Sequence, residues 1–259
     1  MIWLLVLQLA IGPAQHYENA REDFAQRKYS EAVREVDFAL HENPNMVPAL
    51  VLKARLATFA HRTDVAKSCL ITAITIDPAY EEAQFYLGVL FYELNDFKLA
   101  ISPLQAAQKL SPNSPLPAFY LAMTHEALGD QNQALELYQQ AENLSPQTSP
   151  QSAEIAVAYG RLLVSLGRTQ DGIEKERRAI GIDPKSRDAH YVLAKGLEHE
   201  GDFENAAREG ELALTLPAAN ASDAEIHFLL TRLYRKLNKP DLAEAHMEKF
   251  LALKKTTQK

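Results

Sequence analysis

Prolines that follow a polar residue recur along the chain at a nearly constant spacing. The successive intervals between them are 34, 34, 34 and 38 residues. The prolines are Pro44, Pro78, Pro112, Pro146 and Pro184. A period of about 34 residues is typical of helix-turn-helix repeats, in which each repeat is one pair of helices. The spacing therefore predicts an array of repeated helix pairs instead of one closed core.

Two rows of alanine keep the same frame as the prolines. The alanines lie twelve and five residues before the first four prolines, at Ala32, Ala66, Ala100 and Ala134 and at Ala39, Ala73, Ala107 and Ala141. Because residues seven apart share one face of a helix, these small side chains let a neighbouring helix approach closely. The proline then ends the helix, since it lacks an N–H donor and its ring clashes with the preceding turn.

The frame places two helices and a turn in every repeat. In the third repeat, we predict helices from about Glu82 to Leu94 and from about Phe97 to Leu110. The turn between them is predicted at Asn95–Asp96, and the other turns at 27–28, 61–62, 129–130, 167–168, 201–202 and 238–239. Seven repeats follow, at about 13–46, 47–80, 81–114, 115–148, 153–186, 187–220 and 224–257.

The third and fourth repeats carry a recognisable pattern. The segments YLGVLFYELNDFKLAISPLQAAQKLSP (86–112) and YLAMTHEALGDQNQALELYQQAENLSP (120–146) closely resemble the tetratricopeptide repeat family. The resemblance covers nearly everything after the N-terminal run, although the tryptophan of the family is missing throughout. It implies an all-α fold, a right-handed α-solenoid of seven repeats whose concave side is lined by the first helices.

Two departures from the repeat pattern lie near the middle of the chain. Residues 149–152 are inserted between the fourth and fifth repeats, and the fifth repeat has Gly172 and Glu176 where alanine and an apolar residue are expected. Glycine inside a helix costs about 1 kcal/mol relative to alanine. We therefore predict repeats one to four over 15–148, an insertion that acts as a hinge at 149–152, and repeats five to seven over 153–257.

The chain opens on an apolar run, Ile2–Ile11, broken only by Gln8. The run is too short to span a bilayer. It has the length of a secretory signal, and Gly12-Pro13-Ala14 offers small residues for cleavage, but no Lys or Arg precedes it. Residues 1–14 are thus predicted to be a signal peptide of a periplasmic or secreted protein. The alternative is an apolar helix that packs under the first repeat of a cytoplasmic protein.

Composition and motifs argue against several functions. A net charge of -7 argues against nucleic-acid binding. Cys69 is the only cysteine, so no internal disulfide and no cysteine-based zinc site can form. The eight histidines form no H-E-x-x-H motif, and no phosphate loop or G-x-S-x-G elbow is present. We predict neither cofactor nor metal, and no enzyme activity.

In the family that the chain resembles, the fifth and ninth places of each repeat face inward. Here the fifth place is large and apolar, at Tyr17, Val51, Phe85, Phe119, Val157, Tyr191 and Phe228. The ninth place is basic in five repeats, at Arg21, Arg55, Arg161, Lys195 and Arg232, and apolar at Val89 and Met123. Places four apart are neighbours on a helix. The resemblance thus implies a partner-binding groove with an aromatic floor, including Tyr92 at its centre, and cationic sides.

This groove suits a protein or an extended peptide with acidic groups that pair with the arginines. The alternative is that the aromatic rings pack between neighbouring first helices while the arginines only solvate the surface. The favoured function is a non-enzymatic scaffold that binds a protein or peptide on the concave face. The second hypothesis is an accessory subunit that positions substrate for an enzyme, or that belongs to an envelope or secretion assembly.

Overall fold

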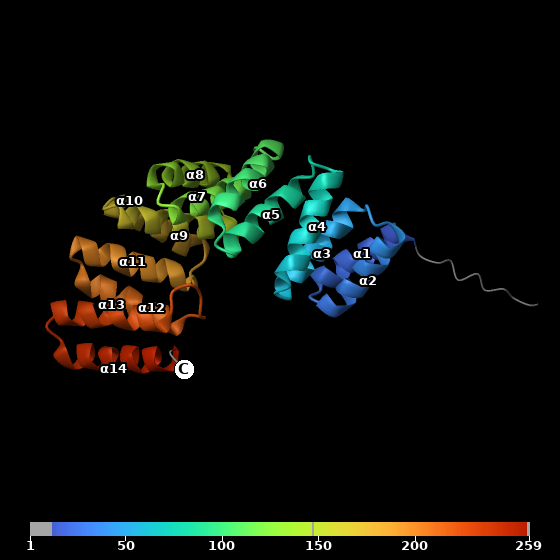
Figure 1. Cartoon of the computed structure of the whole chain (residues 1–259). Coiled ribbons are helices and arrows are strands. Elements are labelled where there is room, and N and C mark those ends of the chain that lie inside the picture. Colours follow the sequence, from blue (N-terminus) through green and yellow to red (C-terminus); the bar gives the residue numbers. More distant parts are fainter. Residues whose placement is uncertain (1–11, 147, 258–259) are drawn as a thin grey trace, which may run out of the picture. The chain divides into compact units, whose positions relative to one another are not determined.

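A computed structural model describes residues 12–146 and 148–257 of the 259-residue chain, and within these ranges it contains helices and turns but no β-strand (Figure 1). The prediction of an all-α chain of helix-turn-helix repeats is therefore confirmed. The chain divides into two compact parts, of which the first ends at Leu128 and the second begins at Gly129. We call them unit 1 and unit 2.

Unit 1 is built from helix pairs in which each first helix also contacts the first helix of the next pair. Its first helices are α1 (Pro13–Ala25), α3 (Val47–Phe59), α5 (Glu81–Glu93) and α7 (Pro115–Ala127). Its second helices are α2 (Tyr29–Glu42), α4 (Thr63–Ile76) and α6 (Phe97–Leu110). The bounds predicted for the third repeat differ from those of α5 and α6 by no more than one residue.

Unit 2 has the same construction. Its first helices are α9 (Pro150–Ser165), α11 (Arg187–Glu200) and α13 (Asp223–Lys236). Its second helices are α8 (Gln131–Leu144), α10 (Thr169–Ile182), α12 (Phe203–Thr215) and α14 (Pro240–Thr257).

The turn after each first helix contains one residue in the left-handed region. The φ angles of these residues lie between 55° and 84°, at Arg27, His61, Asn95, Gly129, Gly167, Gly201 and Asn238. In the third repeat, the Asp96 N–H then donates to the Phe91 carbonyl at 2.8 Å, which closes the end of the helix. All seven turns lie where the sequence predicted them.

The alanine rows form the centre of the repeat cores. All eight side chains predicted to allow close helix approach are completely buried. Around them in unit 1 pack larger residues such as Leu50, Leu70 and Leu90. In unit 2 the completely buried apolar side chains include Ile226 and Leu230 of α13 and Ile155 of α9. Burial of each such side chain stabilises the fold by about 1.5–3 kcal/mol.

The predicted signal peptide lies almost entirely outside the described residues. Gly12 precedes α1, and Pro13 and Ala14 are the first residues of that helix. Export from the cytoplasm therefore stays a prediction. No helix in the described ranges combines the length and the apolar character needed to cross a membrane.

The insertion predicted at 149–152 lengthens a helix. Pro150 is the first residue of α9, and the Ser149 hydroxyl accepts a hydrogen bond from the Ser152 N–H at 3.1 Å. The guanidinium of Arg178 on α10 donates to Ser152 Oγ at 2.8 Å and to the Glu142 carboxylate of α8 at 2.6 Å. These contacts tie α8, α9 and α10 together, and the hinge itself stays a prediction.

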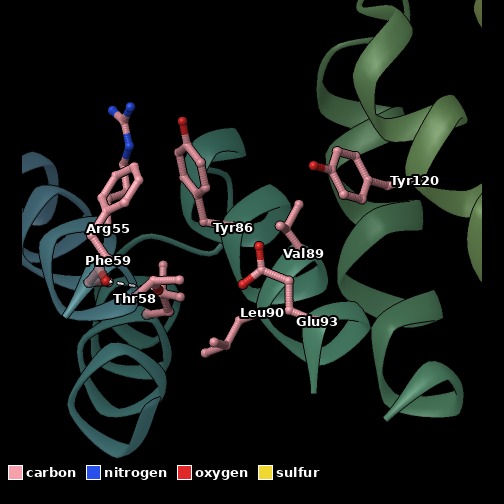
Figure 2. Close-up of a pocket in the computed structure, with 10 residues that line it drawn as sticks. Arg55, Thr58, Phe59, Tyr86, Val89, Leu90, Glu93 and Tyr120 are labelled. Carbon is pink, nitrogen blue, oxygen red and sulfur yellow. Dashed lines mark hydrogen bonds between the residues drawn. The ribbon is translucent and has the colours of Figure 1, made fainter. Parts of the chain in front are cut away.

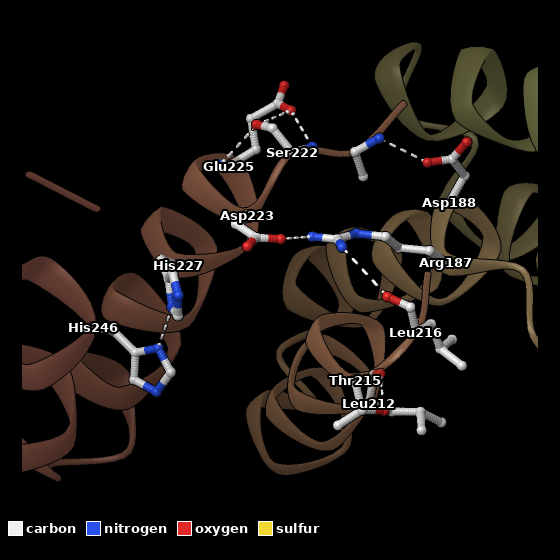
Figure 3. A network of polar contacts seen from close by, with 11 residues as sticks. Arg187, Asp188, Leu212, Thr215, Leu216, Ser222, Asp223, Glu225, His227 and His246 are labelled. Atoms are coloured by element: carbon white, nitrogen blue, oxygen red, sulfur yellow. Dashed lines mark hydrogen bonds and ion pairs between the residues drawn. The ribbon is translucent and has the colours of Figure 1, made fainter. Parts of the chain in front are cut away.

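A polar network holds the segment between α12 and α13 (Figure 3). The buried guanidinium of Arg187, at the start of α11, pairs with Asp223 and donates to the Leu216 carbonyl. The neighbouring Asp188 carboxylate accepts from the Ala221 N–H at 2.7 Å. Both side chains thus fasten the segment between α12 and α13 to α11. The described atoms leave Arg187 Nε without a hydrogen-bond acceptor.

Two buried histidines join α13 to α14 (Figure 3). The Nδ1 atoms of His227 and His246 are 2.8 Å apart, so one imidazole donates to the other. Glu211 of α12 lies 3.0 Å from His246 Nε2 and accepts from the Tyr234 hydroxyl. Burial and the neighbouring histidine lower the pKa of His227, although Asp223 and Glu211 oppose this shift. Burial, with a smaller effect of Lys249, lowers the pKa of His246, although Glu211 opposes it.

We expect acid to loosen the packing of α14 on α13. A folded-state pKa below the unfolded value means that the unfolded chain binds more protons, so stability is full above about pH 6.5 and falls as the pH drops below it. The slope is at most about 1.4 kcal/mol per pH unit for each histidine. Amide hydrogen exchange of α14 should accelerate between pH 6.5 and 5, after correction for the intrinsic exchange rate.

Replacing both histidines with leucine should remove this pH dependence, because no imidazole is left between the helices to bind a proton as the pH falls below about 6.5. His199→Gln is the control, since His199 is exposed on α11. Acceleration of α14 exchange that persists in the double variant would contradict the assignment.

Candidate functional site

A hollow of about 220 Å³ opens between the first helices of unit 1 (Figure 2). Helix α3 contributes Arg55, Thr58 and Phe59 to its lining, and α5 contributes Val89 and Glu93. The remaining lining residues are Ala54, Leu70, Tyr86, Leu90 and Tyr120. In Figure 2, Tyr120 of α7 points back across the hollow towards α5. The sequence predicted Arg55 and Val89 as groove residues, and the structure brings both into this lining.

Arg55 is held by aromatic rings from two other helices. Its guanidinium carbon lies 4.6 Å from the ring centroid of Phe24 on α1 and 4.8 Å from that of Tyr86 on α5. Cation–π contacts of this kind stabilise by about 0.5–2 kcal/mol, depending on how far they are removed from water. The side chain of Arg55 is half-buried. Its position is therefore set by packing from α1, α3 and α5.

An exposed aromatic group borders the hollow. Phe59, at the end of α3, is 61% exposed and stacks on Tyr29 of α2 with ring centroids 5.4 Å apart. Phe24 lies 5.8 Å from both rings. We call Phe24, Tyr29 and Phe59 the aromatic edge. Large rings left open to water in a group are a common mark of interaction surfaces.

The two aromatic residues predicted to form the floor are buried. Phe85 is only 8% exposed and Phe119 only 7%. Phe85 packs against Tyr86 and Tyr120 with centroids 5.3 and 5.4 Å away, and Phe119 lies 5.8 Å from Tyr120. The expectation of an exposed floor is corrected here, because these rings fill the space between neighbouring first helices. The open faces nearby belong to Tyr86 and Tyr120.

The other predicted residues of unit 1 surround this centre. The Arg21 guanidinium lies 5.8 Å from the Tyr17 ring centroid and pairs with Glu18 at 2.9 Å. Tyr92 packs against Phe97 and Tyr120. Met123 is half-buried on α7. None of these four predicted residues lines the hollow.

In unit 2, two of the predicted cations cover the aromatic residue four places earlier on the same helix. Lys195 lies over Tyr191 at 5.6 Å, and Arg232 over Phe228 at 5.5 Å. Arg232 also pairs with Glu198 at 2.6 Å. Arg161 is exposed on α9. The predicted groove residues therefore lie in both units. That they form one groove along all seven repeats stays a prediction.

Several residues of the hollow were not predicted from the sequence. Tyr86 and Tyr120 occupy the sixth place of the third and fourth repeats, directly after Phe85 and Phe119. Thr58, Phe59 and Glu93 occupy the twelfth and thirteenth places of their repeats. These places also face inward in the family, so reading the last turn of each first helix would have found them.

Burial changes the acidity of two groups in the lining. It raises the pKa of the Glu93 carboxyl and that of the Tyr86 hydroxyl, the latter against the opposing charge of Arg55. The lining thus combines one guanidinium, one carboxyl group and two tyrosines around an apolar base. These groups can hydrogen-bond and pack, and no nucleophile with an adjacent base stands among them.

Within residues 12–146 and 148–257, no three His, Cys, Asp or Glu side chains come together as a metal ion would require. Burial also raises the pKa of the half-buried Cys69 thiol, which lowers its reactivity.

Comparison with known families decides the affiliation of the chain. A tetratricopeptide repeat family model matches residues 51–115 and 119–187, and a second model with the same description matches residues 226–259. The chain belongs to the tetratricopeptide repeat family. This family generally provides non-catalytic scaffolds that bind proteins or peptides. No curated protein shows significant sequence similarity to this tetratricopeptide repeat protein.

Solved structures share its fold at low sequence identity. A chain of the APC/C hetero-tetramer Cut9–Hcn1 has a TM-score of 0.75 and 19% identity, and the match covers 86% of this chain but only 43% of that one. Pseudomonas aeruginosa pilF has a TM-score of 0.70 and 17% identity, over 80% of this chain and 91% of that one. YrrB, described as a tetratricopeptide repeat protein with an unusual peptide-binding site, has a TM-score of 0.55 and 18% identity, over 70% and 91%.

Proposed function

We propose that this tetratricopeptide repeat protein is a non-enzymatic scaffold that binds an extended segment of a partner protein on the first-helix face of unit 1. The observation that carries the proposal is the hollow between α3, α5 and α7, with its aromatic edge. Its lining offers apolar surface with a few polar groups at fixed positions, which is the usual composition of a binding site. The peptide-binding site named for YrrB shows that the fold can carry such a function.

An extended segment suits the site better than a helix or a compact ligand. The hollow continues into the aromatic edge, so a side chain can enter it while the backbone passes over Phe59. The backbone N–H and C=O groups of the bound segment would stay in water on the side away from the hollow, so they would need no hydrogen-bond partner from this protein. Export from the cytoplasm is proposed separately, and sequencing of the mature N-terminus tests it, since an intact Met1 would overturn it.

A carboxylate placed in the hollow should weaken peptide binding. We expect peptides selected from a display library of random 12-residue sequences on the full chain to lose at least about tenfold in affinity on Val89→Glu, because the new charge must be desolvated against an apolar base. Fluorescence polarisation with the selected peptides measures this loss. Circular dichroism checks that the variant keeps the helicity of the parent.

Ile71→Glu is the matched control. It makes the same chemical change in unit 1, but at a side chain on α4 that is 46% exposed and does not line the hollow. Equal loss in both variants, or none in Val89→Glu, would place the binding surface elsewhere.

A further inference from the structure

We propose that Arg55 selects a partner segment in which one Asp or Glu side chain lies beside a large apolar side chain. This inference rests on the proposed function and names the chemistry of the partner. The carboxylate would bind the guanidinium of Arg55, and the apolar side chain would enter the hollow beside Thr58 and Val89.

Arg55 differs in its partners from three other cations of unit 1, each of which pairs with a carboxylate. Arg21 pairs with Glu18, Arg34 with Glu31 and Lys53 with Asp37, at N–O distances of 2.9, 3.6 and 2.7 Å. Among the described residues, by contrast, neither an ion pair nor a hydrogen-bond acceptor accompanies the Arg55 guanidinium, and its neighbours are the rings of Phe24 and Tyr86. Its fork of N–H donors is thus available to a carboxylate from outside.

The guanidinium is also pre-organised. A free arginine on a surface loses side-chain entropy when it binds, and this loss offsets much of the gain from an exposed ion pair. Arg55 is already confined by rings on two sides, so less freedom remains to be lost. Rings that exclude water around the guanidinium further strengthen a charge-assisted hydrogen bond. A planar, two-pronged carboxylate fits the fork better than a single acceptor does.

The rest of the lining limits how acidic the partner can be. Glu93 stands in the same hollow, and Glu81 and Glu82 lie at the start of α5. A second carboxylate deeper in the hollow would be repelled by Glu93, whereas an apolar group, an amide or a hydroxyl would be accepted. The charges therefore fit one acidic side chain followed by apolar contact, and they disfavour a run of acidic residues.

Peptide selection on the full chain tests the inference. A random 12-residue display library selected on the parent protein should yield peptides that share one Asp or Glu at a fixed distance from an aromatic or large aliphatic residue. Changing that acidic residue to its amide should weaken binding by about 10- to 100-fold, as expected for a hydrogen bond between charged groups. The Arg55→Gln variant should bind the acidic peptide about as weakly as the parent protein binds the amide peptide. It should also bind the acidic and the amide peptides equally.

Arg55→Lys retains the charge but not the fork, and we expect an intermediate affinity. Arg34→Gln is the control, because it removes an equal charge from α2, where Arg34 pairs with Glu31. Circular dichroism shows whether each variant keeps its helices. Should Arg55→Gln lose helicity, the comparison of acid and amide peptides on the parent protein still decides the question.

The outcomes separate the two proposals. Peptides that depend on Val89 but show no acidic preference, and that bind Arg55→Gln as well as the parent, would overturn the role of Arg55 and leave the hollow as the binding site. Selected peptides that bind Val89→Glu unchanged would overturn the proposed function itself. A preference for phosphoserine over Asp at the shared position would overturn the assignment to a carboxylate.

Discussion

Replacing Gly172 with alanine is expected to destabilise unit 2 by about 2 kcal/mol, although alanine is the better helix former. A Cβ on Gly172 would lie 2.8 Å from the Gly160 carbonyl oxygen and 2.6 Å from Val164 Cγ2. The first of these neighbours is backbone, so it can move only if α9 and α10 separate. Overpacking of this kind costs about 1–3 kcal/mol or more, whereas the gain in helix propensity is at most about 1 kcal/mol.

Gly181→Ala is the matched control for this substitution. Gly181 lies on the same helix, its φ is not positive, and a Cβ there would meet no atom within 4 Å. We expect this variant to be more stable than the parent by about 0.5–1 kcal/mol. Urea denaturation followed by circular dichroism gives the stability, and hydrogen exchange shows whether α9 and α10 open. A Gly172→Ala protein as stable as Gly181→Ala would disprove the close approach of α9 and α10.

Replacing Glu176 with methionine is expected to stabilise unit 2 by about 1–3 kcal/mol at pH 8. The side chain is completely buried on α10, and neither carboxylate oxygen has a hydrogen-bond partner among the described atoms. Burying an ionisable group without partners opposes folding, and an apolar side chain of similar volume removes that cost. Gly160 makes room for the carboxylate, because a Cβ at that position would collide with Glu176 Oε1.

The stabilisation should depend on pH with a defined sign. Burial raises the pKa of Glu176 well above its usual value, partly offset by Arg161. The native state then binds more protons than the unfolded state. The buried carboxyl therefore costs the parent protein least below about pH 4.5, and the stability of the parent falls as the pH rises towards the folded pKa. The advantage of Glu176→Met should therefore be larger at pH 8 than at pH 5.

Paired urea titrations at the two pH values measure this difference. Glu174→Met is the control, since Glu174 is exposed two residues earlier on α10 and should show no such dependence. An advantage that is equal at both pH values would mean that Glu176 does not enter the core as a titrating group.

Gly172 and Glu176 show how a correct repeat frame can misjudge a single position. Both residues depart from the repeat pattern, and the sequence alone predicts that the glycine weakens its helix. The structure gives it a packing role, because its missing Cβ lets α10 approach the Gly160 carbonyl. That approach depends on a pair of glycines twelve residues apart on two helices, which no local propensity describes.

The candidate site was likewise predicted only in part from the sequence. The places that face inward were known from the resemblance, and Arg55 and Val89 do line the hollow. Phe85 and Phe119 occupy the fifth place of their repeats, which is also expected to face inward, but they are buried, because the neighbouring first helices come close enough to enclose their rings. The arrangement of Arg55 between Phe24 and Tyr86 joins residues more than thirty positions apart, and only the packing of α1, α3 and α5 brings them together.

By itself the sequence determined the helix pairs, their period, the seven turns and the alanine rows, because each of these follows from local backbone chemistry repeated at a fixed interval. The tertiary structure decided which inward-facing side chains are open and which are enclosed, and which charges lack a partner. Those properties depend on the distance between helices, and that distance is set jointly by side chains far apart in the chain.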